Sequence, residues 1–292
     1  MENLRFIVGI GASAGGLKPI CELIRNLPVD NNAAYVVVQH MSPDRKSMLT
    51  ELISRETRLS VVQIGEDTEI AADTIYVCPP NRDVLVSDRR LKLVDPSPLA
   101  RVPKPSVDRF LTSLASDMAE RAVGVILSGT GSDGAYGVQA VHERGGIAIA
   151  QTAESAGFDG MPVAAIGSGC IDLVMEPGDI GTHLARIMAT PGDLTQFKQQ
   201  ETDVDPLQDI FQIVIQRKRV DFRDYRRTTV NRRIERRMLA LGITSAEDYT
   251  AYCRTHPAEV DALFRDLLIS VTRFFRDNAD FERLQITIGE MV

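Results

Sequence analysis

Several features that mark other classes of protein are missing from this chain of 292 residues. No apolar run approaches the ~20 residues of a membrane-spanning helix, so we expect no membrane insertion. No signal peptide opens the chain, because Glu2 and Asn3 precede a short apolar run. The cysteines are far apart and form no C-x-x-C pair, which argues against a disulfide framework (Cys21, Cys78, Cys170, Cys253). We therefore expect a cytoplasmic protein with core cysteines and no metal site.

An overall excess of positive charge is also missing, since the formal net charge is −7. Residues 217–237 are the exception, with ten basic and three acidic residues. A local basic segment in an acidic protein indicates a binding surface or a solvated helix face.

What the chain does contain is a specific motif near its start. The apolar run Phe6–Ile10 predicts a buried strand, a glycine-dense turn follows, and Leu17, Ile20 and Ile24 predict a helix. Gly9-x-Gly11-x-x-Ala14 fits a dinucleotide-binding turn, whereas Gly11-x-Ser13-x-Gly15 fits a nucleophile elbow. The simplest alternative is that the glycines only permit a tight turn.

The end of the next predicted strand favours the elbow. A dinucleotide site requires an acidic residue about 20 positions after the glycine-rich turn, to hold a ribose hydroxyl. The run Ala34–Val38 ends instead in Gln39-His40. A histidine at that place is the base that a serine nucleophile needs.

The remaining pattern predicts an α/β fold. Strands alternate with helices as far as residue 190, including a hairpin of Asp83–Ser87 and Leu91–Val94. This alternation predicts a three-layer αβα, doubly wound, mostly parallel sheet over residues 1–190. A polar linker is expected at 191–206, and the pattern beyond it predicts a small all-α helical domain.

A second glycine-rich loop follows the buried run Ala122–Leu127 and contains Asp133. Ser13, His40 and Asp133 each follow a predicted strand, and ligands of such sheets bind at the carboxyl ends of the strands. This placement suits a Ser-His-Asp triad. The alternatives are that Asp133 and Asp108 are helix caps and that the histidine is an ordinary core or surface residue, as we expect for the other three (His142, His183, His256).

The segments GIGASAGG, VVVQHM, IYVCPP, LSGTGSDGAYG and FDGMPVAAI resemble, in order and spacing, the catalytic domain of the chemotaxis protein-glutamate methylesterase (CheB) family. The resemblance implies Ser13 as nucleophile, His40 as base and Asp133 as orienting acid, with Ala14, Thr130 and Met161 lining the site. Ala14 replaces the usual Ser or Thr, so its part in an oxyanion site would fall to its backbone N–H. Thr130 replaces a frequent Met, and Arg82 a frequent His. Because no receiver domain precedes residue 1, we expect no control by phosphorylation in cis.

Residues from 207 onward resemble the N-terminal helical domain of the chemotaxis receptor methyltransferase (CheR) family, through VDFRDYRR, RRIERRM and LLISVTRFFRD. The resemblance implies a helical domain at 207–277, with 278–292 as the start of a truncated S-adenosylmethionine-binding domain. It also implies a partial cofactor site at Thr272 and Arg276, although Ser270 replaces the usual Asn. S-adenosylmethionine would bind only if the full methyltransferase domain were present.

The basic segment has three interpretations. In order of preference they are docking on acidic chemoreceptor helices, a solvated helix face and nucleic-acid binding, the last disfavoured by few interleaved aromatics. The docking residues would be Arg232, Arg233, Arg236 and Arg237. We therefore expect a receptor glutamate methylesterase, able also to deamidate glutamine, that needs no cofactor for the esterase reaction and transfers no methyl group. A non-catalytic module that docks on receptors is the alternative, and a dinucleotide-dependent oxidoreductase is a weaker third.

Overall fold

The computed structural model describes residues 4–41, 48–96, 104–190, 207–223, 225 and 227–268. The chain divides into two compact units. The first comprises residues 1–200 together with Arg236–Thr244, and the second comprises the residues 201–235 and 245–292. The expected linker at 191–206 and the expected segment at 278–292 lie outside the described residues.

A seven-stranded sheet forms the centre of the first unit, and every described pairing in it is parallel. Its spatial order is β10-β9-β8-β1-β2-β5-β3. The central strands are buried apolar runs, as expected where helices cover both faces. The strands are β1 (Phe6–Ala12), β2 (Ala33–Gln39), β3 (Ser60–Gln63), β5 (Thr74–Val77), β8 (Ala122–Ile126), β9 (Ile147–Gln151) and β10 (Leu173–Met175).

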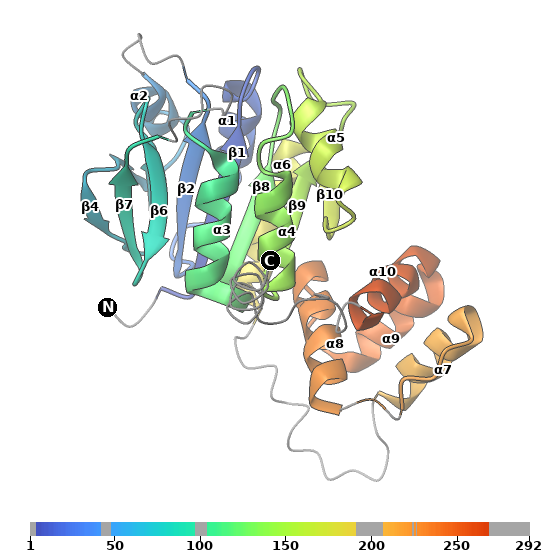
Figure 1. The fold of residues 1–292 in the computed structure, drawn as a ribbon. Coiled ribbons are helices and arrows are strands. Elements are labelled where there is room, and N and C mark those ends of the chain that lie inside the picture. Colours follow the sequence, from blue (N-terminus) through green and yellow to red (C-terminus); the bar gives the residue numbers. More distant parts are fainter. Residues whose placement is uncertain are drawn as a thin grey trace, which may run out of the picture. The chain divides into compact units, whose positions relative to one another are not determined.

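Helices cover the two faces of this sheet in separate groups (Figure 1). One apolar core joins the sheet to α1 (Leu17–Arg25), α2 (Leu49–Ser54) and α6 (Pro177–Ala189). The other joins it to α3 (Val107–Met118), α4 (Ala135–Glu143) and α5 (Gly160–Gly167). A short 3-10 turn, η1 (Ala119–Arg121), leads from α3 into β8. The prediction of a three-layer doubly wound fold is confirmed.

A smaller antiparallel sheet packs into the core on the α3 side. It consists of β4 (Asp67–Glu69), β7 (Arg90–Val94) and β6 (Asp83–Ser87), in that order. The predicted hairpin is its β6–β7 pair. The strand β4 was not predicted, because three residues are too few for an alternating pattern to stand out.

The second unit contributes α7 (Gln208–Lys218), α9 (Ala246–Thr255) and α10 (Pro257–Leu268), and α8 (Arg227–Leu241) begins in it. Ser245 caps α9, since its hydroxyl accepts the backbone N–H of Asp248 at 3.0 Å. The described part of this unit contains only helices, which confirms the predicted all-α pattern.

The last residues of α8 belong with the first unit, a difference from the predicted division. Ala240 is part of the core that contains α1 and α6, and His183 donates to its carbonyl oxygen at 2.6 Å. The sequence does not reveal this, because the apolar spacing of α8 fits packing in either unit equally well.

Within the described ranges, no helix is long and apolar enough to cross a membrane.

Candidate active site

Ser13 lies in the turn between β1 and α1, at the carboxyl end of a central strand. The turn closes when the backbone N–H of Gly16 donates to the Ser13 carbonyl oxygen at 3.0 Å. Gly15 takes the left-handed conformation at φ +71°, which suits a residue without a Cβ. Ser13 itself is not among the described residues with positive φ, so this turn differs from the strained elbow of the α/β-hydrolases.

His40 follows β2, the strand beside β1. The pairing register ends at Ala12 opposite Gln39, and the backbone N–H of His40 donates to the Ala12 carbonyl oxygen at 3.0 Å. The next residues along the two strands are Ser13 and His40, so the register brings the predicted nucleophile and base to the same edge of the sheet.

Asp133 supplies the third group. Its Oδ2 lies 2.8 Å from His40 Nε2, and the two side chains are 5% and 12% exposed. His40 Nδ1 is then the ring nitrogen left for Ser13. No hydrogen bond joins the Ser13 hydroxyl to His40 in the part of the chain that the structure describes, and such bonds often tighten only when substrate binds.

The carboxylate of Asp133 also caps α3. It accepts the backbone N–H groups of Val107 at 2.8 Å and Asp108 at 2.9 Å. Burial opposes ionisation, but the hydrogen bonds from His40 and from these two backbone groups lower the pKa of Asp133 below its usual value. The carboxylate therefore stays ionised, as required to orient an imidazole and stabilise its charged form.

Asp108, in the first turn of α3, caps α4 in return. Its Oδ1 accepts the backbone N–H groups of Gly134 at 2.8 Å and Gly137 at 2.7 Å. Burial, with a further contribution from the neighbouring Asp133, raises the pKa of Asp108 to about 6. Both carboxylates are thus helix caps, as the alternative interpretation predicted: Asp133 caps the helix that contains Asp108, and Asp108 caps the helix that follows Asp133.

Of the three residues expected to line the site, Ala14 directly follows Ser13, Thr130 directly follows Gly129, and Met161 packs against Gly129. Among the described residues, no acceptor is bonded to the backbone N–H of Ala14 or Thr130, so both donors are available to an oxyanion. Met161 is fully buried, and its backbone N–H donates to the Gly129 carbonyl oxygen at 2.8 Å. A Cβ on Gly129 would lie 2.1 Å from the Met161 sulfur and 2.8 Å from the Ser13 Cβ, which explains the glycine there.

These residues meet where the order of the strands reverses. From β1 the chain proceeds to β2 on one side of the sheet, and β8 pairs with β1 on the other. Such a switch point at the carboxyl ends of parallel strands is the usual ligand site of a doubly wound sheet.

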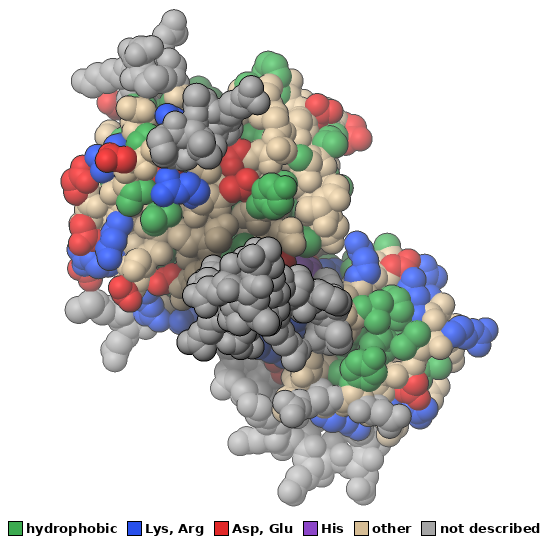
Figure 2. Space-filling model, in the orientation of Figure 1, with side chains coloured by type: hydrophobic (Ala, Val, Ile, Leu, Met, Phe, Trp, Pro, Cys, Tyr) green, Lys and Arg blue, Asp and Glu red, His purple; other side chains and the backbone are tan. Residues whose placement is uncertain are grey.

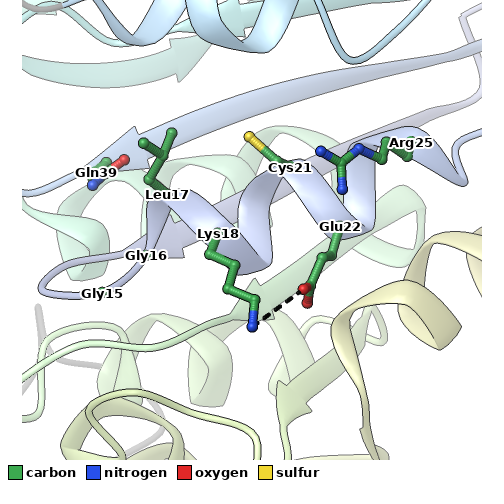
Figure 3. A pocket seen from close by; sticks show the side chains of 8 residues that line it. All are labelled: Gly15, Gly16, Leu17, Lys18, Cys21, Glu22, Arg25 and Gln39. Atoms are coloured by element: carbon green, nitrogen blue, oxygen red, sulfur yellow. Dashed lines mark ion pairs between the residues drawn. The ribbon is translucent and has the colours of Figure 1, made fainter.

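A groove of about 630 Å³ follows one face of α1 (Figure 3). It adjoins the turn between β1 and α1 that contains Ser13, which we call the nucleophile turn. Gly15, Gly16 and Leu17 line the end nearest the turn, with Gln39 beside them. The other lining residues belong to the following turns of α1: Lys18, Cys21, Glu22 and Arg25. No pattern in the sequence predicts this groove, because it depends on how β2 lies against α1.

Other residues around the site were also not identified from the sequence. Ser128 and Gln151 are buried and hydrogen-bonded to each other behind the nucleophile turn. Asp83 accepts the backbone N–H of Ser106, the N-cap of α3, at 2.8 Å, and pairs with the Arg109 guanidinium. Their roles arise from tertiary contacts, although Ser128 lies within the segment LSGTGSDGAYG that carries the family resemblance.

Two of the expected receptor-docking residues prove to be buried. Arg236 and Arg237 are 5% and 3% exposed, and each donates to a different oxygen of Asp172 at 2.7 Å. The expectation that they belong to an exposed cationic face is therefore wrong. Arg232 is exposed and Arg233 half-buried, so docking through this pair stays a prediction.

The partial cofactor site expected at Thr272 and Arg276 lies outside the described residues. The described residues also include no group of three His, Cys, Asp or Glu side chains placed to hold a metal ion. Of the other histidines, His142 and His183 are buried as predicted for core residues.

Charged side chains of both signs intermingle over the β4-β7-β6 sheet (Figure 2). They include the exposed pairs of Arg82 with Glu66 and of Arg90 with Asp67, each at 2.7 Å. This part of the surface therefore carries no block of one charge.

Comparison with known families gives two matches. Residues 8–184 match the CheB methylesterase family, and residues 205–268 match the all-alpha domain of the CheR methyltransferases. In a crystal structure, the CheB methylesterase catalytic domain of Thermotoga maritima is similar to this chain, with a TM-score of 0.57 and 30% identity. The similarity covers 62% of this chain and 98% of that domain.

Two relatives illustrate how much of each protein is shared. A protein-glutamate methylesterase/protein-glutamine glutaminase of Myxococcus xanthus is 35% identical over 185 residues, which are 62% of this chain and 53% of that protein. An uncharacterized 104.1 kDa protein of Rhodobacter capsulatus is 37% identical over 262 residues, covering 81% of this chain and 27% of that protein. This chain thus spans about half the length of the Myxococcus enzyme and about a quarter of the Rhodobacter protein.

Proposed function

This chain belongs to the CheB methylesterase family, and on that premise we propose that its first unit hydrolyses the γ-methyl ester of glutamate side chains on chemoreceptors. The observation that carries the proposal is the placement of Ser13, His40 and Asp133 at one edge of the sheet, with a 2.8 Å contact between His40 and Asp133. The proposed substrates are receptor helices in the cytoplasm.

In the proposed reaction, Ser13 Oγ attacks the ester carbonyl carbon while His40 takes the serine proton. The backbone N–H groups of Ala14 and Thr130 hold the oxyanion of the tetrahedral intermediate. Methoxide leaves with the proton from His40, so methanol and a glutamyl-serine ester form. Water then attacks this ester with His40 again as base, which releases the glutamate and restores Ser13.

The same steps would deamidate a receptor glutamine, with ammonia in place of methanol as the first product. The Myxococcus relative is named for both reactions. For the second unit we propose no methyl transfer by this chain alone. Calorimetry with S-adenosylhomocysteine is expected to show no binding in the micromolar range, and micromolar binding would contradict this part of the proposal.

The test of the main proposal is methanol release from receptor membranes that carry labelled methyl esters. The wild-type chain is expected to release methanol and to be labelled by a fluorophosphonate probe, and the variant Ser13→Ala to do neither. Ser113→Ala, which changes a serine on α3, should behave as wild type. Release by the Ser13→Ala variant would refute the assignment of the nucleophile. Receptor binding without release by the wild type would favour the alternative of a non-catalytic docking module.

A further inference from the structure

Ser128 is a fully buried residue just after β8, and it contacts the nucleophile turn through two different atoms. Its backbone carbonyl oxygen accepts the N–H of Ser13 at 2.9 Å. Its hydroxyl lies 2.9 Å from the carbonyl oxygen of Ala14, to which it donates. The two peptide groups that flank the Ser13–Ala14 peptide, which carries the Ala14 N–H, are therefore both bonded to one residue.

The remaining hydrogen bonds of Ser128 fix its own position. Its backbone N–H donates to Gln151 Oε1 at 2.8 Å, and its hydroxyl oxygen accepts the backbone N–H of Phe158 at 3.0 Å. A hydroxyl has one proton to donate. The nearer acceptor for that proton is Ala14 O at 2.9 Å rather than Phe158 O at 3.2 Å.

This arrangement joins the nucleophile turn to the loop before α5. Phe158 lies against the turn on its outer side, since a Cβ on Gly15 would be 3.0 Å from its ring. The same Cβ on Gly15 would lie 3.0 Å from the Ser128 hydroxyl oxygen. The turn is thus enclosed between Ser128 and Phe158, and the Ser128 hydroxyl is the polar group that connects them.

We propose that Ser128 is a positioning residue of the esterase: its hydroxyl fixes the Ala14 carbonyl group, and with it the orientation of Ala14, so that Ser13 Oγ and the Ala14 N–H act on the same carbonyl group. The proposal rests on the proposed function and adds a residue that touches neither substrate nor leaving group. Its effect should appear in the rate of acyl transfer rather than in substrate binding, because displacing reacting groups by a fraction of an ångström slows chemistry strongly.

The test compares Ser128→Ala with Ser113→Ala in the full chain. The Ser113 hydroxyl makes the same kinds of bond, donating to Phe110 O at 2.7 Å and accepting the Val86 N–H at 3.0 Å, but away from Ser13. Ser128→Ala is expected to lower kcat on p-nitrophenyl acetate and the rate of fluorophosphonate labelling by about 10- to 100-fold, with little change in KM. Ser113→Ala should leave both rates within about twofold of wild type.

Wild-type rates in a folded Ser128→Ala variant, or equal losses in the two variants, would overturn the proposal. Circular dichroism checks the fold. If the alanine variant does not fold, Ser128→Cys takes its place, because a thiol is close in size but a weak hydrogen-bond donor. Its labelling rate should also fall, and a wild-type rate would count against the proposal. Fluorophosphonate labelling without methanol release from receptors would refute the proposed substrate and leave the role of Ser128 testable.

Discussion

Asp108 and Asp133 show how two identical side chains acquire opposite properties from their surroundings. Asp133 is buried and Asp108 half-buried, and both cap a helix, but only Asp133 also receives a hydrogen bond from a histidine. Its pKa falls, whereas burial raises the pKa of Asp108 to about 6. The two carboxylates therefore affect stability in different ranges of pH.

The first prediction concerns this difference. Below about pH 6 the folded chain binds a proton at Asp108 that the unfolded chain, with its ordinary value of 3.8, does not bind. The contribution of Asp108 to stability therefore increases as pH falls from about 6 to about 4 and is lost as pH rises through 6. In Asp108→Asn this dependence should disappear, while an asparagine oxygen can still accept the Gly134 and Gly137 N–H bonds.

Urea unfolding of the wild type and of Asp108→Asn between pH 4.5 and 7.5 measures how the free energy of unfolding of each depends on pH. The lowered pKa of Asp133 makes its own stabilisation decline mainly below this range, so the difference between the two curves isolates Asp108. Parallel curves would show that Asp108 does not titrate in the folded chain.

A second prediction concerns the close approach at Gly129. A Cβ there would overlap the Met161 sulfur, which can move, and would press on the Ser13 Cβ, which cannot move without displacing the nucleophile. Gly129→Ala is therefore expected to lower kcat by about 100-fold, measured with a small ester. Gly167→Ala is the matched control, since a Cβ at Gly167 would meet no atom within 4 Å. Similar rates in the two variants would contradict the account of Gly129.

At the scale of single residues, the sequence indicates candidate site residues where their role depends on a position at the end of a strand. Ser13, His40 and Asp133 follow strands whose apolar runs are easily recognised, and parallel strands place their carboxyl ends together. Ser128 and Asp108 act through loops and helix ends that meet only in the folded chain. No local pattern distinguishes Asp108 from a cap of its own helix.

At the scale of elements, α1 performs two tasks. Its buried face, with Ile20, Leu23 and Ile24, packs on the sheet and holds the nucleophile turn in place. Its outer face lines the groove that begins at that turn (Figure 3). The helix was predicted from its apolar spacing, but the groove was not, since its wall includes Gln39 at the end of β2.

The third prediction is that this groove accommodates the part of the receptor next to the scissile ester. Cys21→Trp should fill the groove and raise KM for methylated receptor by about tenfold or more, while kcat/KM for p-nitrophenyl acetate stays near wild type. The control is Val174→Trp, at an exposed position on the edge strand β10. An unchanged KM for receptor in the Cys21 variant would show that the receptor approaches Ser13 from another side.

At the scale of the whole molecule, the first unit is assembled from two separate parts of the sequence. Arg236 and Arg237 belong to it and share the carboxylate of Asp172, whose side chain is 1% exposed. Arg236 also lies 2.7 Å from His142 Nδ1 and donates to the Gly146 carbonyl oxygen at 3.1 Å. From the sequence we predicted that the basic segment 217–237 lies at the surface. The sequence shows its positive charge but not that a buried acid, Asp172, pairs with two of its arginines.

The fourth prediction is that Asp172→Ala destabilises the first unit by about 3–5 kcal/mol, because two buried guanidinium groups lose their carboxylate. Asp67→Ala removes an equally short bond, to Arg90 at 2.7 Å, but at the surface, and should cost much less stability. Both values are measured by urea unfolding. Equal costs would mean that the Asp172 cluster is no more important than a surface ion pair.

The discontinuous first unit also has a consequence for synthesis on the ribosome. When residue 200 leaves the exit tunnel, Asp172 is outside the ribosome but the arginines that neutralise it are not. At about 5–20 residues per second, the chain as far as residue 244 follows roughly 2–9 s later. During that interval Asp172 lacks the two arginines that pair with it in the complete chain, so the final folding step of the first unit must wait for a segment encoded beyond the next domain's first helix.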